Sequence, residues 1–214
     1  MTSWTSYKNL YKAHGFKRVW THFRETTLFD ILNGVDTGNW RPLSEYSQTD
    51  SDMKHYQASF TREVIKCFNL LKSIAKTESF TFYDIGCGKG KVLILAAKHL
   101  PCRGIVGIEL DDHLAHIASN NMQKLGLKAE IIRENARQFN DYSKRSIVYI
   151  CDPFGKETLQ QMLVNISQAS EDCFLVYNNP VYEALVEAAR FKKVGETTGW
   201  HSNYHTSIYH YKRH

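Results

Sequence analysis

A glycine-rich turn is the part of this 214-residue sequence whose residue types and spacing best fit ligand chemistry. Asp84 lies near the end of the apolar run 79–85, and glycines occupy alternate positions from Gly86 to Gly90 before a helical pattern over 91–100. Glycine allows the backbone to turn tightly and a ligand to approach it with no side chain in between. We therefore predict a small-molecule site at a strand-to-helix turn.

The spacing of these glycines does not fit a dinucleotide site, whose G-x-G-x-x-G fingerprint needs a glycine where this chain has Lys91. The Asp-x-Gly-x-Gly-x-Gly pattern instead resembles motif I of the class I S-adenosylmethionine (SAM) methyltransferases. That resemblance implies a Rossmann-like fold, SAM as cofactor and S-adenosylhomocysteine as product. It places Asp84, Gly86, Cys87 and Gly88 around the cofactor. A structural turn that binds no ligand is the alternative.

The composition is that of a globular protein, with 43% hydrophobic and 23% charged residues, and we expect one domain. We find neither an 18-residue apolar stretch nor a signal-peptide pattern, so we expect a cytoplasmic protein that does not bind membranes. The five cysteines form no C-x-x-C pair, which favours reduced thiols.

The first 24 residues contain no acid, and basic residues alternate there with aromatic ones. The basic residues are Lys8, Lys12, Lys17, Arg18 and Arg24, and the aromatic ones include Trp4, Tyr7, Tyr11, Phe16 and Trp20. Such a segment can bind nucleic acid or an acidic partner. The alternative is a helix with a solvated basic face and an aromatic face packed on the domain. Exposed aromatics could also form a dimer surface.

Apolar runs alternate with helical patterns after the glycine turn, which predicts a parallel sheet built from strand-helix-strand units. The expected strands are 79–85, 103–110, 128–133, 146–151 and 173–177, and the expected helices are 91–100, 112–125, 156–168 and 181–190. For the last of these helices, Asn179 fits an N-cap and Pro180 the first helical position.

Two strand-like runs at 191–197 and 204–211 predict a C-terminal hairpin. A mostly parallel seven-stranded sheet that ends in such a hairpin, sandwiched between two helix layers, is what the resembled superfamily implies for residues 79–214. Residues 1–78 are expected to form a helical cap or lid of the same domain, with helices near 3–32 and 56–76.

Glu109 and Asn135 follow the second and third expected strands. A carboxylate at the end of the second strand can accept hydrogen bonds from both ribose hydroxyls, although an acid there could instead favour the next helix's N-terminus, as Asp111 or Asp112 could. In the resembled superfamily an acid at the position of Asn135 binds the adenine amino group. The Asn135 amide oxygen could accept the same bond, and a plain turn is the alternative.

Asp152-Pro153-Phe154 follows the fourth strand and looks like a shortened form of the Asn/Asp-Pro-Pro-Tyr/Phe motif of methyltransferases that act on planar nitrogen. The resemblance implies Asp152 at the reaction centre and Pro153 and Phe154 in the substrate pocket. Because the second proline is missing, nitrogen is only slightly favoured over oxygen as the acceptor. Asn178, after the fifth strand, lies at the same expected edge and is a further pocket candidate.

Upstream, the Gly-Val-Asp-Thr stretch that contains Asp36, together with Tyr56, resembles a poorly characterised bacterial group of class I methyltransferases. We expect Asp36 to contact substrate or a lid, with a turn role as the alternative, and Tyr56 to lie in the substrate pocket. Four histidines near the C-terminus lack a recognisable ligand set, so no metal is expected.

The sequence thus predicts a SAM-dependent methyltransferase whose acceptor could be a small molecule, a protein or a nucleic acid. The alternative is a non-catalytic SAM-binding module that docks RNA or a protein partner through its basic N-terminal region.

Overall fold

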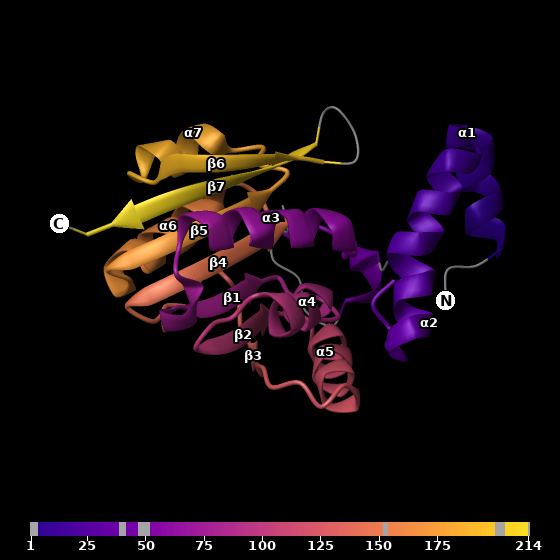
Figure 1. Ribbon diagram of the computed structural model, residues 1–214, viewed down its shortest axis with the longest axis horizontal. Coiled ribbons are helices and arrows are strands. Elements are labelled where there is room, and N and C mark those ends of the chain that lie inside the picture. The colour runs from indigo at the N-terminus through magenta and orange to yellow at the C-terminus, as the bar shows by residue number, and fades with distance from the viewer. Residues whose placement is uncertain (1–3, 39–41, 47–51, 152–153, 200–203, 214) are drawn as a thin grey trace.

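A computed structural model describes residues 4–38, 42–46, 52–151, 154–199 and 204–213. Its centre is one seven-stranded sheet with the order β3-β2-β1-β4-β5-β7-β6 (Figure 1). The strands are β1 Thr81–Ile85, β2 Gly104–Glu109, β3 Glu130–Arg133, β4 Arg145–Cys151, β5 Asp172–Asn178, β6 Lys192–Thr198 and β7 His205–Lys212. β1 to β5 are parallel and β7 is antiparallel to both β5 and β6, so the predicted mostly parallel sheet with a terminal hairpin is confirmed.

The central strands are apolar on both faces, because helices cover both sides of the sheet. Along β4, Ile147 and Tyr149 belong to one buried cluster, whereas Val148 and Ile150 belong to another on the opposite face. The first cluster includes side chains of α3 Thr61–Ile74, α4 Lys91–His99 and α5 Asp112–Lys124, and the second includes those of α6 Lys156–Ala169 and α7 Glu183–Ala188. These layers form the expected three-layer sandwich.

The helix predicted over 181–190 begins differently from our expectation. Asn179 is not its N-cap: its φ is 54°, its N–H donates to the His205 carbonyl oxygen at 2.9 Å, and α7 starts only at Glu183 after Tyr182. Asparagine tolerates this left-handed conformation, so the chain turns against the start of β7 instead of entering a helix.

The helix predicted over 56–76 is also shorter than expected, since α3 begins at Thr61 and Phe60 is extended. Residues 54–60 run without regular secondary structure across the carboxyl edge of the sheet, apart from a bridge position at Tyr56. This segment, which we call the crossing segment, takes part in the site described below.

The N-terminal region is helical, as predicted. α1 Trp4–Phe23 is interrupted at Gly15, the π-helix η1 Arg24–Leu28 continues it, and α2 Phe29–Asn33 ends at the left-handed Gly34. Two short 3-10 helices, η2 Leu43–Glu45 and η3 Thr77–Ser79, complete the secondary structure. α1 stands away from the sheet, to the right in Figure 1. None of the described helices is both long and apolar enough to cross a membrane.

Candidate functional site

The glycine turn between β1 and α4 requires glycine for two separate reasons. Gly86, Gly88 and Gly90 have φ values of 72°, 55° and 80°, which side chains disfavour. A Cβ atom on Gly88 would also lie 2.1 Å from a ring carbon of Tyr56. The turn is tied to β2, because the N–H groups of Gly86 and Cys87 both donate to the Ile108 carbonyl oxygen, at 2.8 and 3.0 Å.

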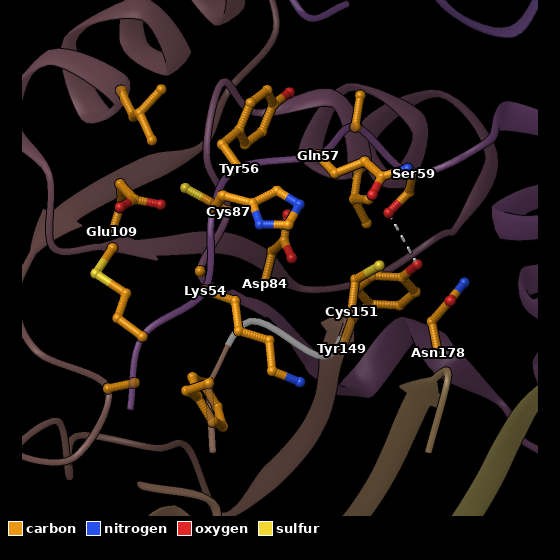
Figure 2. Close-up of a pocket in the computed structure, with 18 of the residues that line it drawn as sticks. Lys54, Tyr56, Gln57, Ser59, Asp84, Cys87, Glu109, Tyr149, Cys151 and Asn178 are labelled. Carbon is orange, nitrogen blue, oxygen red and sulfur yellow. Dashed lines mark hydrogen bonds between the residues drawn. The ribbon is translucent and has the colours of Figure 1, made fainter. Parts of the chain in front are cut away.

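A cavity of about 360 Å³ opens beside this turn, between the carboxyl ends of the parallel strands and the crossing segment. Figure 2 shows Lys54, Tyr56, Gln57 and Ser59 around the same space as Asp84, Glu109 and Tyr149. Of the residues predicted from sequence, the cavity is lined by Tyr56, Asp84, Gly86, Cys87, Glu109, Asn135, Phe154 and Asn178. Asp152 and Pro153 lie outside the described residues.

Asp84 carries a buried carboxylate that lines the cavity. Its side chain belongs to a residue only 3% exposed, and Oδ2 has no hydrogen-bond partner among the described residues. Burial, and to a smaller extent the nearby Glu109 carboxylate, raise the pKa of Asp84 well above its usual value. A buried oxygen without a hydrogen bond lowers the stability of the folded protein, so a cationic or donor group in the cavity that binds Oδ2 would remove this cost.

Glu109, at the end of β2, is the second buried carboxylate of the cavity. Its Oε2 accepts a hydrogen bond from the Gly88 N–H at 2.8 Å, and Oε1 accepts one from the Asp111 N–H at 3.0 Å. Burial raises its pKa to about 7, although these two N–H groups act in the opposite direction. Asp111 caps α5 through the Leu114 N–H, so the capping role that was the alternative for Glu109 is already filled.

Asn135 forms the turn considered from the sequence and also lines the cavity. Its Oδ1 accepts a hydrogen bond from the Arg137 N–H at 2.9 Å, which is a turn-forming contact, and the residue also lines the cavity. Its contact with a cofactor stays a prediction.

Asp36 is not one of the residues that line the cavity. Its carboxylate oxygens lie 3.0 and 3.1 Å from the Lys89 ammonium, and its backbone pairs with the Asn121 side chain. Tyr56 reaches the same region, because its hydroxyl donates to the Thr37 carbonyl oxygen at 2.7 Å. Asp36 thus attaches the segment after α2 to the glycine turn and α5.

Two residues at the site were missed from the sequence. Lys91 is buried at the start of α4, donates to the Glu25 carbonyl oxygen and lies 4.7 Å from the Phe29 ring centre; burial lowers its pKa to about 8. Lys91 occupies the position at which a dinucleotide fingerprint has glycine, and this lysine was the feature of the sequence that could have pointed to it. Asp52 accepts hydrogen bonds from the Thr158 N–H and hydroxyl, at 3.0 and 2.7 Å, and so caps the start of α6. Asp52 and Thr158 are 106 positions apart in the sequence, so no local sequence pattern indicates their contact.

The cavity's other end, at β4 and β5, offers neutral polar groups. Cys151 and Asn178 are direct neighbours across the two strands, and Asn178 is 8% exposed. The Tyr149 hydroxyl donates to the Ser59 hydroxyl at 3.3 Å, a contact drawn in Figure 2. Burial raises the pKa of Tyr149 well above its usual value, so it stays a neutral phenol. Among the described residues, no group of three or more His, Cys, Asp or Glu side chains could hold a metal ion.

The sheet order, the terminal hairpin and the glycine turn define a class I methyltransferase fold. Residues 82–171 match the family described as methyltransferase domain. A solved structure, magnesium protoporphyrin IX methyltransferase from Synechocystis with bound SAM, superimposes with a TM-score of 0.55 at 13% identity and covers 90% of this chain and 94% of its own. These findings show the fold of the class I SAM-dependent methyltransferases and a methyltransferase-domain match over residues 82–171.

Two curated relatives share sequence with the chain. A protein-lysine N-methyltransferase from Saccharolobus islandicus is 35% identical over 68 residues, which are 31% of this chain and 42% of the relative. An rRNA adenine N-6-methyltransferase from Enterococcus faecalis is 26% identical over 143 residues, 66% of this chain and 56% of the relative. The chain thus spans about half the length of the curated relatives it matches.

Proposed function

We propose that this protein binds SAM in the described cavity and transfers its methyl group to a nitrogen acceptor. The observation that carries the proposal is the Asp84 carboxylate, which is buried, lines the cavity beside the glycine turn and has an oxygen with no partner among the described residues. The ammonium group of the methionine end of SAM is a chemically suitable partner for that oxygen.

Other residues that line the cavity would bind the ribose and the adenine of the cofactor. Each Glu109 oxygen accepts one backbone hydrogen bond and keeps a further lone pair for a ribose hydroxyl. Asn135 lines the cavity after β3, where it can meet the adenine edge. Gly86 and Cys87 line the cavity, so the cofactor can lie against the backbone of the glycine turn, whose N–H groups at these two residues already bind the Ile108 carbonyl oxygen. Residues 79–214 would then be the cofactor-binding core and residues 1–78 its cap.

Bound SAM supplies an electrophilic methyl group on a sulfonium, which is already a good leaving group. The protein's task is therefore to exclude water and hold the acceptor atom in line, for which few dedicated catalytic groups are needed. The crossing segment closes the cavity on the side opposite the strand ends. Asp152, which lies outside the described residues, is the candidate for contact with the reacting nitrogen.

A nitrogen acceptor is favoured by the acceptor end of the cavity. The Asn178 amide oxygen can accept a hydrogen bond from an amino group and so orient its lone pair, and Phe154 supplies an aromatic surface. The two curated relatives are named as methyltransferases of protein lysine and of rRNA adenine, both nitrogen acceptors.

Transfer of labelled methyl groups tests this function. Protein incubated with methyl-tritiated SAM should label either purified ribosomal RNA or a protein extract, and Asn178→Ala should slow the transfer about tenfold or more while SAM affinity is kept. Asn140→Ala, at an exposed loop position, is the matched control and should behave as wild type. SAM binding without label in either fraction would oppose the enzymatic reading and favour a non-catalytic SAM-binding module.

A further inference from the structure

α1 presents aromatic side chains to solvent. Tyr11, Phe16 and Trp20 are 57%, 69% and 51% exposed, although large aromatic groups are usually buried when a core is within reach. The helix stands away from the sheet in Figure 1. The sequence left open whether these rings pack on the domain. In the structure more than half of each ring residue stays exposed, although Trp20 stacks on Phe23 with the ring centres 5.8 Å apart.

Both parts of α1, before and after the kink at Gly15, are also basic. Lys8, Lys12 and Lys17 are exposed on α1, and the first acid of the chain is Glu25, at the start of the π-helix that follows. Aromatic residues and lysines are also adjacent in the sequence, as in Tyr11-Lys12 and Phe16-Lys17. This combination of charge and planar surface limits the partners that fit.

We propose that α1 docks a single-stranded nucleic acid, whose phosphates pair with the lysines and whose bases stack on the exposed rings. Each nucleotide carries one anionic and one planar group, which is the alternation that α1 offers. A second copy of this chain fits less well, because two α1 surfaces would oppose like charges. A duplex fits less well because its bases are already stacked.

The cavity and the exposed rings lie on different sides of this helix. Arg18, which lines the cavity, is two positions from both Phe16 and Trp20 and so lies about 160° around the helix from each. A strand stacked on these rings therefore lies on the face turned away from the cavity. Docking does not require methyl transfer, and it can therefore be measured without SAM and judged separately from the proposed function.

Fluorescence anisotropy with a labelled 20-nucleotide oligouridylate tests the proposal. Phe16→Ala with Trp20→Ala should weaken binding at least tenfold, since a stacked base contributes about tenfold or more in affinity. Lys12→Gln with Lys17→Gln should weaken it and reduce the slope of log affinity against log salt by about 1.4. The control variant, Val164→Ala with Lys124→Gln, changes one exposed apolar and one exposed basic residue on α6 and α5 and should bind as wild type.

Three results would overturn the proposal. The first is unchanged affinity in the ring variant with its helix content intact by circular dichroism, because the rings would then play no part. The second is equal binding of a 20-base-pair duplex or of polyglutamate, which would indicate a general anion surface or an acidic protein partner. The third is a wild-type dimer that the ring variant dissociates in sedimentation, which would assign the surface to a second copy. Calorimetric SAM binding in the same variants shows whether the cofactor site is intact, whatever the outcome for α1.

Discussion

Replacement of Glu109 by Gln should change how the stability of the ligand-free protein depends on pH. The wild-type carboxylate is buried, and its pKa rises from 4.5 to about 7 in the folded protein. Folding therefore favours the protonated form, and the stabilisation from this group is complete below pH 4.5 and is lost as the pH rises through 7. Glutamine cannot titrate, so this loss is absent in the variant.

The size of the effect follows from the two pKa values. For a group with pKa 4.5 unfolded and about 7 folded, proton linkage removes about 2.5 kcal/mol of wild-type stability between pH 5 and pH 8. Asp84 adds to this in the same direction, because its pKa is raised partly by the Glu109 charge. Glutamine can also accept only one of the two N–H groups that Gly88 and Asp111 donate, which costs about 1–3 kcal/mol at every pH.

Urea unfolding followed by tryptophan fluorescence at pH 5, 6, 7 and 8 measures both effects. The stability of the wild type relative to Glu109→Gln should fall by about 2.5 kcal/mol from pH 5 to pH 8. SAM affinity of the wild type should fall below pH 7, as the Glu109 carboxylate gains its proton, and this dependence should be weaker in the variant, in which only Asp84 still titrates. A stability difference that stays constant over this pH range would refute the assignment of Glu109 as a buried, water-poor carboxylate.

The remaining predictions concern the glycine turn and the start of α6. Gly88→Ala should abolish SAM binding, because the new Cβ would overlap the Tyr56 ring. Gly126 is the matched control: its φ of 62° is similar, but a Cβ there would meet no atom within 4 Å. Gly126→Ala should therefore lower the free energy of unfolding by only about 1–2 kcal/mol. Equal SAM affinity in both variants, by calorimetry, would contradict this. Asp52→Ala should remove the carboxylate that accepts hydrogen bonds from the Thr158 N–H and hydroxyl at the start of α6. The free energy of unfolding should fall by about 1–2 kcal/mol, and an unchanged urea midpoint would contradict this prediction.

The sequence predicted the elements that local periodicity determines. The alternation of buried strands and amphipathic helices after the glycine turn gave the parallel strands and the terminal hairpin, because apolar spacing reflects which faces become buried. Glu109 was found by the same logic, since a strand end fixes where its side chain points. These features depend on residues within one or two elements.

The features that sequence could not predict depend on distant contacts. Asn179 and Pro180 fit a helix start locally, but the hydrogen bond between Asn179 and His205, at the start of β7, decides the conformation. The crossing segment was taken for helix, yet Tyr56 reaches Thr37 across 19 positions and lies over the glycine turn. For Asp36 the sequence allows a substrate contact, a lid contact or a turn, and its ion pair with Lys89 follows only from the fold.

Calorimetric titration with SAM, using wild type, Asp84→Asn and Asp112→Asn, tests the central claim most directly. Asp112 is an exposed acid at the start of α5 and serves as the matched control. The account predicts that wild type and Asp112→Asn bind SAM alike and that Asp84→Asn binds about 10- to 100-fold more weakly, as expected for loss of a charge-assisted hydrogen bond. Folded wild-type protein that binds neither SAM nor S-adenosylhomocysteine, or an Asp84→Asn variant that binds SAM as tightly as wild type, would contradict it.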